Sequence, residues 1–170
     1  MTGPNSRVSI RKATLHDIPV IRHIAMQTWP ETYGSILSPD QLEYMLELIY
    51  SPAALAMQFR QDHHFHLAEA NGTAVGFCSY FFTEPGVMKL AKLYVIPPAQ
   101  GTGAGKALMN LFLDAAKKSG ATKVILNVNR FNNTRTFYEK LGFTISHEEK
   151  IDIGNGYIMD DYVMMKFVEA

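Results

Sequence analysis

Hydrophobic positions near the start of the chain first alternate with polar ones and then recur at helical spacing. Residues 8–12 alternate as a half-buried strand does. Thr14 and Asp17 then form a capping-box pattern at the start of a helix, and Pro30 is expected to end that helix because proline lacks the N–H that continuation needs. The apolar positions of this helix are Ile18, Ile21, Ile24 and Ala25.

Two further helices are predicted before residue 61, and both have clear start signals. Ser38 is a favourable N-cap, Pro39 suits the first helical position, and Gln41 completes a capping box. The apolar stripe that follows predicts an amphipathic helix. Ser51-Pro52 repeats the serine–proline signal and predicts a short helix that ends at about Arg60.

The middle of the chain changes to a period of two, which predicts consecutive strands joined by tight turns. Asn71-Gly72 is a hairpin signal because both residue types tolerate positive φ, and Glu84-Pro85-Gly86 is a second turn signal. The strands are expected at residues 65–70, 75–82 and 87–96.

A glycine-rich segment, residues 100–105, follows these strands and leads into a helix that Gly120 ends. The remaining elements are expected at residues 123–128 (strand), 133–140 (helix), 143–153 (strand) and 157–168 (strand). This order predicts an α+β fold with a mixed, mostly antiparallel sheet, because antiparallel hairpins flank one central βαβ crossover.

The composition is typical of one globular domain. At roughly 150 residues per domain, the 170 residues correspond to about one. A hydrophobic content of 47% and a charged content of 19% argue against disorder. Sixteen basic and 16 acidic residues give zero net charge, which argues against nucleic acid or an anionic membrane as partner. The single cysteine fits a reducing compartment. Because the sequence has no apolar run long enough to span a membrane, we expect a cytoplasmic protein. Residues 1–7 are expected to form a flexible lead-in.

The glycine-rich segment reads QGTGAGK over residues 100–106. Glycines let backbone N–H groups face a ligand, and a helix N-terminus adds partial positive charge, so the segment predicts a phosphate site. It is not a P-loop, because Gln100 and Ala107 stand where that motif needs glycine and a hydroxyl. Gly105 comes one residue too early for the dinucleotide pattern. The segment does fit a third phosphate-binding pattern, Gln-x-x-Gly-x-Gly, through Gln100, Gly103 and Gly105. The alternative is that the glycines only form a tight turn between strand and helix and bind no ligand.

This motif and a second one resemble the GNAT acetyltransferase superfamily. Leu93-Tyr94-Val95 before the glycine segment resembles its coenzyme-A-binding motif, and FYEKLGF at residues 137–143 resembles its second signature. The match is carried mainly by residues 90–143. It implies a single N-acetyltransferase domain over residues 1–170, with helices on both faces of the sheet and a central βαβ unit that binds coenzyme A. It also implies acetyl-CoA as co-substrate and no metal.

The resemblance also implies residues that hold acetyl-CoA. Tyr138 matches the family's general acid, and a phenol with a pKa of about 10 can donate a proton to a thiolate; a plain core aromatic is the alternative. Asn132 matches an asparagine that contacts the pantetheine arm, with Asn129 or Asn133 as alternatives because this segment is one residue shorter than in many members. The implied residues are Leu93, Tyr94, Val95, Gln100, Gly101, Thr102, Gly103, Ala104, Gly105, Lys106, Asn132 and Tyr138.

The general base is not supplied by the strand before the glycine segment, where many family members carry a glutamate. Glu31 and Glu84 are the candidate bases, and solvated carboxylates are the alternative for both. Trp29 and Tyr33 lie where family members build the wall of the acceptor pocket, so they are candidate substrate-binding residues, with plain core as the alternative.

Three other features are expected to have structural roles. The cluster of His63, His64 and His66 has no further ligand group, so no metal site is expected. Cys78 falls on a predicted core strand and should pack as a small hydrophobe. Asp160-Asp161 is expected at the surface or in a turn, with recognition of the acceptor as the alternative.

The leading function is transfer of an acetyl group from acetyl-CoA to a primary amine by direct attack, with a small molecule or a peptide as acceptor. The alternative is a coenzyme-A-binding regulatory module without turnover, and the family resemblance also allows a homodimer. Residues 86–143 hold nine basic and two acidic residues, a net charge of +7, and the rest of the chain holds seven and 14, a net charge of −7. This division favours an anionic cofactor and a cationic, polyamine-like acceptor.

Overall fold

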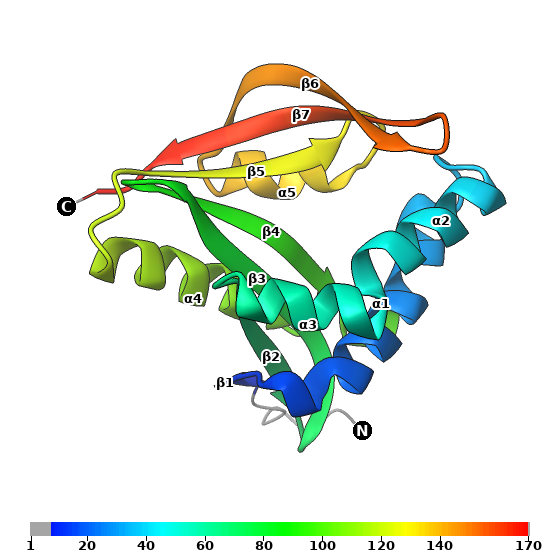
Figure 1. Ribbon diagram of the computed structural model, residues 1–170. Helices are drawn as coiled ribbons and strands as arrows, with labels where there is room; N and C mark the ends of the chain where they lie inside the picture. Colours follow the sequence, from blue (N-terminus) through cyan, green and yellow to red (C-terminus); the bar gives the residue numbers. More distant parts are fainter. Residues whose placement is uncertain (1–7, 170) are drawn as a thin grey trace.

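The structure is a computed structural model that describes residues 8–169 (Figure 1), and the expected lead-in, residues 1–7, lies outside them. The helices are α1 (Ile18–Tyr33), α2 (Pro39–Tyr50), α3 (Pro52–Arg60), α4 (Ala104–Lys118) and α5 (Thr134–Lys140). The strands are β1 (Val8–Lys12), β2 (His64–Ala70), β3 (Thr73–Glu84), β4 (Val87–Val95), β5 (Lys123–Asn129), β6 (Thr144–Gly154) and β7 (Tyr157–Phe167). No helix within residues 8–169 is long and apolar enough to cross a membrane.

The seven strands form one sheet in the order β1-β2-β3-β4-β5-β7-β6. The β4–β5 pair is parallel and is connected through α4, whereas every other neighbouring pair is antiparallel. Helices α1, α2 and α3 pack on one face, and α4 and α5 pack on the other (Figure 1). The expected α+β fold, with a mixed sheet, helices on both faces and a central βαβ unit, is confirmed.

Most of the predicted start signals of the helices and turns are observed, but the capping box expected at Gln41 is not, and the Gln41 side-chain amide instead donates to the Ile158 carbonyl at 3.4 Å. The Ser38 hydroxyl accepts the N–H of Gln41 at 3.2 Å, and the Ser51 hydroxyl accepts the N–H of Ala54 at 3.1 Å. Asn71-Gly72 forms the β2–β3 turn with positive φ at both residues. These elements depend on local backbone chemistry, which is why the sequence pattern predicts them.

The prediction that Pro30 ends the first helix is wrong, because α1 continues through Pro30 to Tyr33. The extra turn packs Trp29 and Tyr33 together, with ring centroids 4.6 Å apart, on the face that α1 shares with α2 and α3. Burial of these rings offsets the backbone hydrogen bond that proline cannot make. The longer helix also carries Tyr33 to within 2.9 Å of the Tyr94 hydroxyl on β4.

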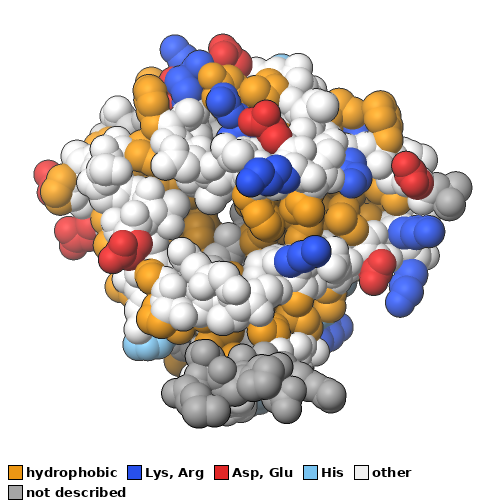
Figure 2. All heavy atoms as spheres, turned by 180° about the vertical axis from the view of Figure 1, so that it is seen from behind, with side chains coloured by type: hydrophobic (Ala, Val, Ile, Leu, Met, Phe, Trp, Pro, Cys, Tyr) orange, Lys and Arg blue, Asp and Glu red, His pale blue; other side chains and the backbone are white. Residues whose placement is uncertain are grey.

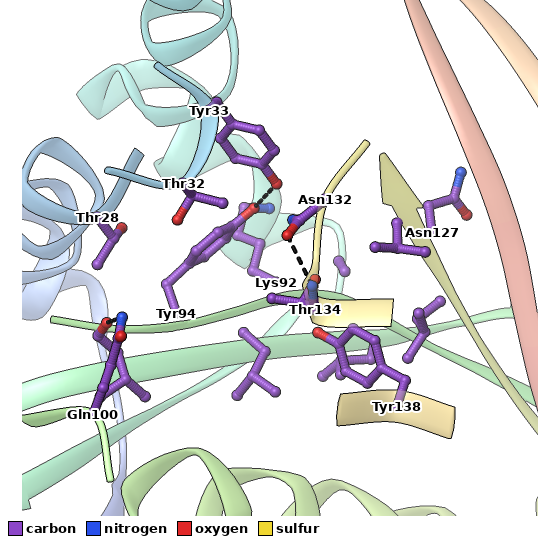
Figure 3. A pocket seen from close by; sticks show the side chains of 16 residues that line it. Thr28, Thr32, Tyr33, Lys92, Tyr94, Gln100, Asn127, Asn132, Thr134 and Tyr138 are labelled. Atoms are coloured by element: carbon purple, nitrogen blue, oxygen red, sulfur yellow. Dashed lines mark hydrogen bonds between the residues drawn. The ribbon is translucent and has the colours of Figure 1, made fainter. Parts of the chain in front are cut away.

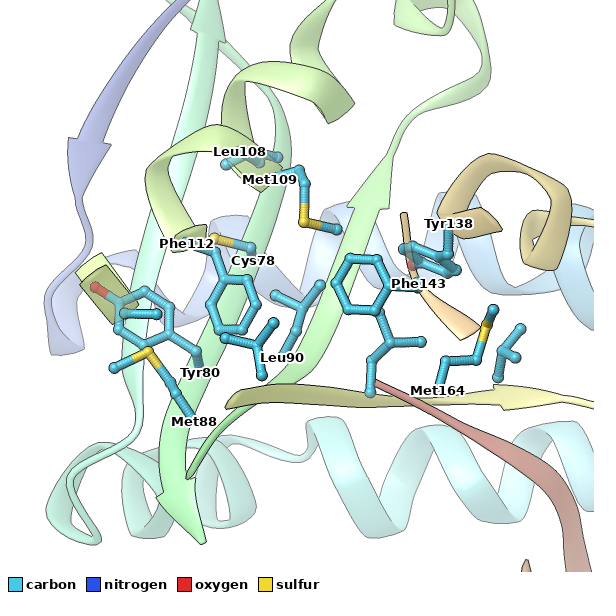
Figure 4. Close-up of a cluster of buried hydrophobic side chains, with 14 of the residues drawn as sticks. Cys78, Tyr80, Met88, Leu90, Leu108, Met109, Phe112, Tyr138, Phe143 and Met164 are labelled. Carbon is cyan, nitrogen blue, oxygen red and sulfur yellow. The ribbon is translucent and has the colours of Figure 1, made fainter. Parts of the chain in front are cut away.

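The core under α4 is a dense apolar layer (Figure 4). Leu108, Met109 and Phe112 of α4 are fully buried against the sheet, at the helical spacing that the sequence shows. Cys78 is fully buried in this layer, which confirms its expected packing role. Burial raises the pKa of its thiol to about 12, so Cys78 stays protonated.

A bulge in β4 decides which side chains reach the other face. Ser79 pairs with Lys92 and Tyr80 pairs with Leu90, so Ala91 has no partner in β3. Because one extra residue reverses the alternation of faces, Leu90 joins the core under α4 while Lys92 contacts the aromatic rings under α1–α3.

Candidate active site

The two halves of the sheet separate along the parallel pair of strands. β4 and β5 pair from Val87 to Leu90 and from Lys123 to Leu126, and their pairing ends there. In Figure 1 the strands up to β4 and those from β5 onward meet at one end and open toward the other. The part of β4 after Leu90 therefore has a free edge, with which an extended ligand can pair as an added strand does.

A cavity of about 130 Å³ lies in this opening, and we call it the β4–β5 cavity. It brings together side chains that are far apart in the sequence, from β4, the following turn and α5 (Figure 3). The predicted cofactor residues that line it are Leu93, Tyr94, Val95, Gln100, Asn132 and Tyr138.

The glycine segment forms the turn between β4 and α4. Gly101 and Gly103 have φ values of 86° and 88°, a conformation that L side chains rarely adopt, and open space surrounds both. The side-chain amide of Gln100 donates to the Val95 carbonyl at 3.2 Å and fastens the turn to the strand. Residues 101–106 lie outside the cavity lining, around the start of α4. Figure 2 shows a hollow near the centre of one face, with Lys and Arg side chains beside it.

Tyr138 reaches the β4–β5 cavity from α5. Burial holds the pKa of its hydroxyl above the ordinary value of 10, so the phenol is protonated and can donate. Asn132 lines the same cavity and accepts the N–H of Thr134 at 3.0 Å, at the start of α5. Of the two alternatives to Asn132, Asn129 lines a second cavity and Asn133 lines neither.

The second cavity, of about 380 Å³, lies between α1, α2 and the sheet, and we call it the aromatic cavity. Trp29 and Tyr33, the predicted acceptor-pocket residues, both line it. The residues that line both cavities are Tyr33, Ala91, Lys92, Tyr94 and Asn127. The two cavities are therefore neighbours, and a group held in one can face a group held in the other.

The chain is similar to known acetyltransferases along most of its length. The model of the acetyltransferase (GNAT) family matches residues 18–143. The chain belongs to the GNAT family. As a GNAT protein it is an N-acetyltransferase, an acyl-transferring enzyme.

Relatives and solved structures of this acetyltransferase cover nearly the whole chain. An uncharacterized N-acetyltransferase of Mycobacterium tuberculosis is 30% identical over 88% of this chain and 97% of its own length. A spermidine N(1)-acetyltransferase of Thermoplasma acidophilum is 28% identical over 90% of this chain and 96% of its own. The crystal structure of the PaiA N-acetyltransferase from that organism, in complex with coenzyme A, has a TM-score of 0.80 at 27% identity and covers 95% of this chain and 99% of its own.

The two predicted bases of the acetyltransferase do not lie at the cavities. Glu31 is exposed on α1 and Glu84 is exposed at the end of β3. Neither lines the β4–β5 cavity or the aromatic cavity. Their catalytic role stays a prediction, and neither carboxylate lies at the cavities where a base would have to act.

Asp161 lines the aromatic cavity, although the sequence favours a surface or turn position for it and gives recognition of the acceptor only as the alternative. The expectation of a surface or turn position is wrong for it, because Asp161 is 2% exposed in β7 and lines the aromatic cavity. The Asn127 amide donates to its Oδ2 at 3.2 Å, while its Oδ1 has no hydrogen-bond partner. Burial raises the pKa of this carboxyl, which makes it a better proton acceptor. Neighbouring Asp160 instead pairs with Arg130 at 3.2 Å.

Lys92 is a site residue that the sequence pattern does not identify, because only the bulge at Ala91 turns it toward the aromatic cavity. It is 8% exposed, and its Nζ donates to the Gln58 side-chain oxygen at 2.7 Å. Its ammonium also lies 5.8 Å and 5.6 Å from the ring centroids of Tyr50 and Phe65. Burial lowers the pKa of Lys92 to about 8, so it is still mostly charged at neutral pH.

The histidine cluster forms no metal-binding group in the part of the chain that the structure describes. Within residues 8–169, no three His, Cys, Asp or Glu side chains are grouped as metal ligands. His63 and His66 instead stack on Phe81 and Tyr80, with ring centroids 4.2 Å and 5.6 Å apart.

Proposed function

We propose that this enzyme transfers an acetyl group from acetyl-CoA to a primary amine by direct attack. The observation that carries the proposal is the junction of the two cavities: the β4–β5 cavity holds the free strand edge and Tyr138, and the aromatic cavity opens beside it. A thioester held along the strand would then face an amine held among the aromatic rings. Holding the two reactants in this geometry is itself a large part of catalysis.

The residues present fit coenzyme A. The free edge of β4 after Leu90 offers backbone groups to the pantetheine arm, and Asn132 faces the same opening. Gly101 and Gly103 keep the turn before α4 clear of side chains, so that backbone N–H groups and the helix start can approach the pyrophosphate. Lys106, in the first turn of α4, is exposed beside this place.

The reaction requires proton transfer both to the leaving sulfur and from the acceptor nitrogen. Acetyl-CoA supplies the thioester, whose C–S bond breaks as the bond between the acceptor nitrogen and the acetyl carbon forms. Tyr138 donates its hydroxyl proton toward the leaving sulfur and regains one from solvent. The acceptor enters as an ammonium ion and loses two protons in forming the amide, so the overall reaction releases one proton.

The acceptor class in this proposal is a primary amine of a small molecule or a peptide. A relative is named for spermidine, which is in line with the polyamine-like acceptor that the charge distribution favours. Another, a ribosomal protein bS18-alanine N-acetyltransferase of Haemophilus influenzae, is named for a protein substrate and is 30% identical over 51% of this chain. A homodimer stays a prediction.

The test is release of free thiol from acetyl-CoA in the presence of pooled primary amines. Substitution Tyr138→Phe should lower kcat by about a hundredfold or more, because general acid catalysis contributes at least that much. Tyr157→Phe is the matched control, since Tyr157 packs on Tyr44 and lines neither cavity. Undiminished turnover in Tyr138→Phe would refute the acid role, and stoichiometric binding of coenzyme A without thiol release would favour the regulatory module.

A further inference from the structure

Unpaired polar atoms gather around the aromatic cavity. Among the described residues, seven buried side-chain nitrogen or oxygen atoms have no hydrogen-bond partner. Four of the seven belong to side chains that line this one cavity: Trp29 Nε1, Tyr50 Oη, His63 Nδ1 and Asp161 Oδ1. The Trp29 indole lies close enough to Tyr50 to act on its hydroxyl as a hydrogen-bond donor, so His63 Nδ1 and Asp161 Oδ1 are the two that most need a partner. A buried polar atom without a partner is costly, so such a concentration indicates a polar ligand that completes the bonds.

One part of the cavity offers hydrogen-bond donors. The Lys92 ammonium has three N–H groups, and Gln58 accepts one of them. Within the described residues no carboxylate forms an ion pair with Lys92. His63 lies close enough for Lys92 to help burial lower its pKa to about 4, so its ring is neutral and can also donate from one nitrogen. An uncompensated ammonium beside further donors is suited to an anionic group with two oxygens.

Another part of the cavity offers a carboxylate. Asp161 is the only acidic residue among the described residues that line the cavity. Its free Oδ1 is suited to an ammonium group, and Asn127, which donates to the other oxygen, lines the β4–β5 cavity as well. Lys92 also lines both cavities, so an amine bound at Asp161 and a carboxylate bound at Lys92 would both lie near the junction with the β4–β5 cavity.

We propose that the acceptor is an amino carboxylate, whose amine binds at Asp161 and whose carboxylate binds at Lys92. This inference rests on the proposed function and specifies its acceptor. The rest of the molecule would contact the apolar side chains that line the cavity, among them Met45, Ile49 and Met159. The volume of about 380 Å³ is within the range of small-molecule sites.

If the acceptor is an amino carboxylate, polyamines should be poor substrates. A polyamine has two or more ammonium groups, and the described lining of the cavity offers one carboxylate to bind them. The buried ammonium of Lys92 would also repel the second ammonium group. Of the described acidic residues outside residues 86–143, Asp161 alone lines the cavity, so the acidic excess does not surround it.

The test compares acceptors that differ only by a carboxylate. Acetyl transfer is measured at neutral pH for phenylalanine against phenethylamine and for γ-aminobutyrate against propylamine, with spermidine as the polyamine. The two pairs cover a short and a longer separation of amine and carboxylate. In at least one pair the carboxylate member should have a kcat/KM about tenfold or more above that of its partner and of spermidine.

Three variants then assign the preference to residues. Lys92→Met should raise the KM of the preferred amino carboxylate about tenfold or more, with a smaller change in kcat, and this rise should exceed any change in the KM of the plain amine. Asp161→Asn should lower kcat/KM for every amine. Lys123→Met is the control, because Lys123 loses the same charge but lines neither cavity.

The proposal is overturned if the plain amines or spermidine react as well as the amino carboxylates, or if Lys92→Met keeps the preference. The acceptor comparison with the unaltered enzyme decides this even if a variant does not fold. If no amine of either kind released thiol from acetyl-CoA, the proposed function itself would be refuted.

Discussion

Replacing Lys92 by methionine should make the protein more stable at neutral pH even though it impairs recognition of the acceptor. Burial lowers the pKa of this ammonium from 10.5 to about 8. At about 1.4 kcal/mol for each tenfold change in the ionisation equilibrium, the charged lysine destabilises the fold by about 3 kcal/mol. Methionine removes this penalty but leaves the Gln58 oxygen without its donor, which costs about 1–2 kcal/mol. The net gain at pH 7 is therefore about 1–2 kcal/mol.

The gain should disappear as the pH rises. Between pH 8 and 10.5 the folded lysine loses its proton while the unfolded lysine keeps it, so the unfolded chain binds more protons and the native protein becomes more stable. The penalty falls from about 3 kcal/mol at pH 7 to about 1 kcal/mol at pH 10. The difference between Lys92→Met and the native protein should therefore change by about 2 kcal/mol in favour of the native protein.

Urea unfolding at pH 7 and pH 10 measures this difference, with the fluorescence of the single buried tryptophan, Trp29, as the signal. Lys117→Met, which removes an exposed lysine at the end of α4, is the control and should change stability by less than about 0.5 kcal/mol at both pH values. A stability difference for Lys92→Met that is the same at both pH values would refute the reasoning. A confirmed gain would mean that the enzyme keeps Lys92 for its function at the expense of folding stability.

Three other properties can be tested separately. Gly103→Ala should lower the melting temperature, because an L residue at φ 88° costs about 1–2 kcal/mol, and it should also weaken coenzyme A binding. Gly105→Ala is the control and should be neutral or stabilising, because its new methyl group meets only an ordinary contact. Asp17→Asn should destabilise the protein by about 1–3 kcal/mol at neutral pH. The hydrogen bond from Arg11 lowers the pKa of Asp17, so its stabilisation is lost as the pH falls below 3.8, and urea unfolding at pH 7 and pH 3 should show the difference shrink. Cys78 should react with a disulfide reagent only in urea, since burial raises its pKa to about 12, and rapid modification in native buffer would contradict this.

Local signals in the sequence are sufficient for the helix starts, the turns and the cofactor side of the site. Ser38 and Ser51 cap helices and Asn71-Gly72 turns the chain because these effects involve only neighbouring backbone groups. The glycine turn before α4 belongs to the same class, since its positive φ values depend on residue type. The motif at residues 137–143 singles out Tyr138, and the fold places its side chain at the β4–β5 cavity.

The acceptor side depends on contacts between residues that are far apart in the sequence. α1 continues through Pro30 because packing of Trp29 and Tyr33 outweighs a local backbone preference. Lys92 faces the aromatic cavity because of a one-residue bulge, which alternation along the strand does not reveal. Asp161 is buried because β7 lies between β5 and β6, and strand order is a property of the whole sheet. The charges that meet the acceptor are therefore selected by register and packing, which no segment of the chain specifies alone.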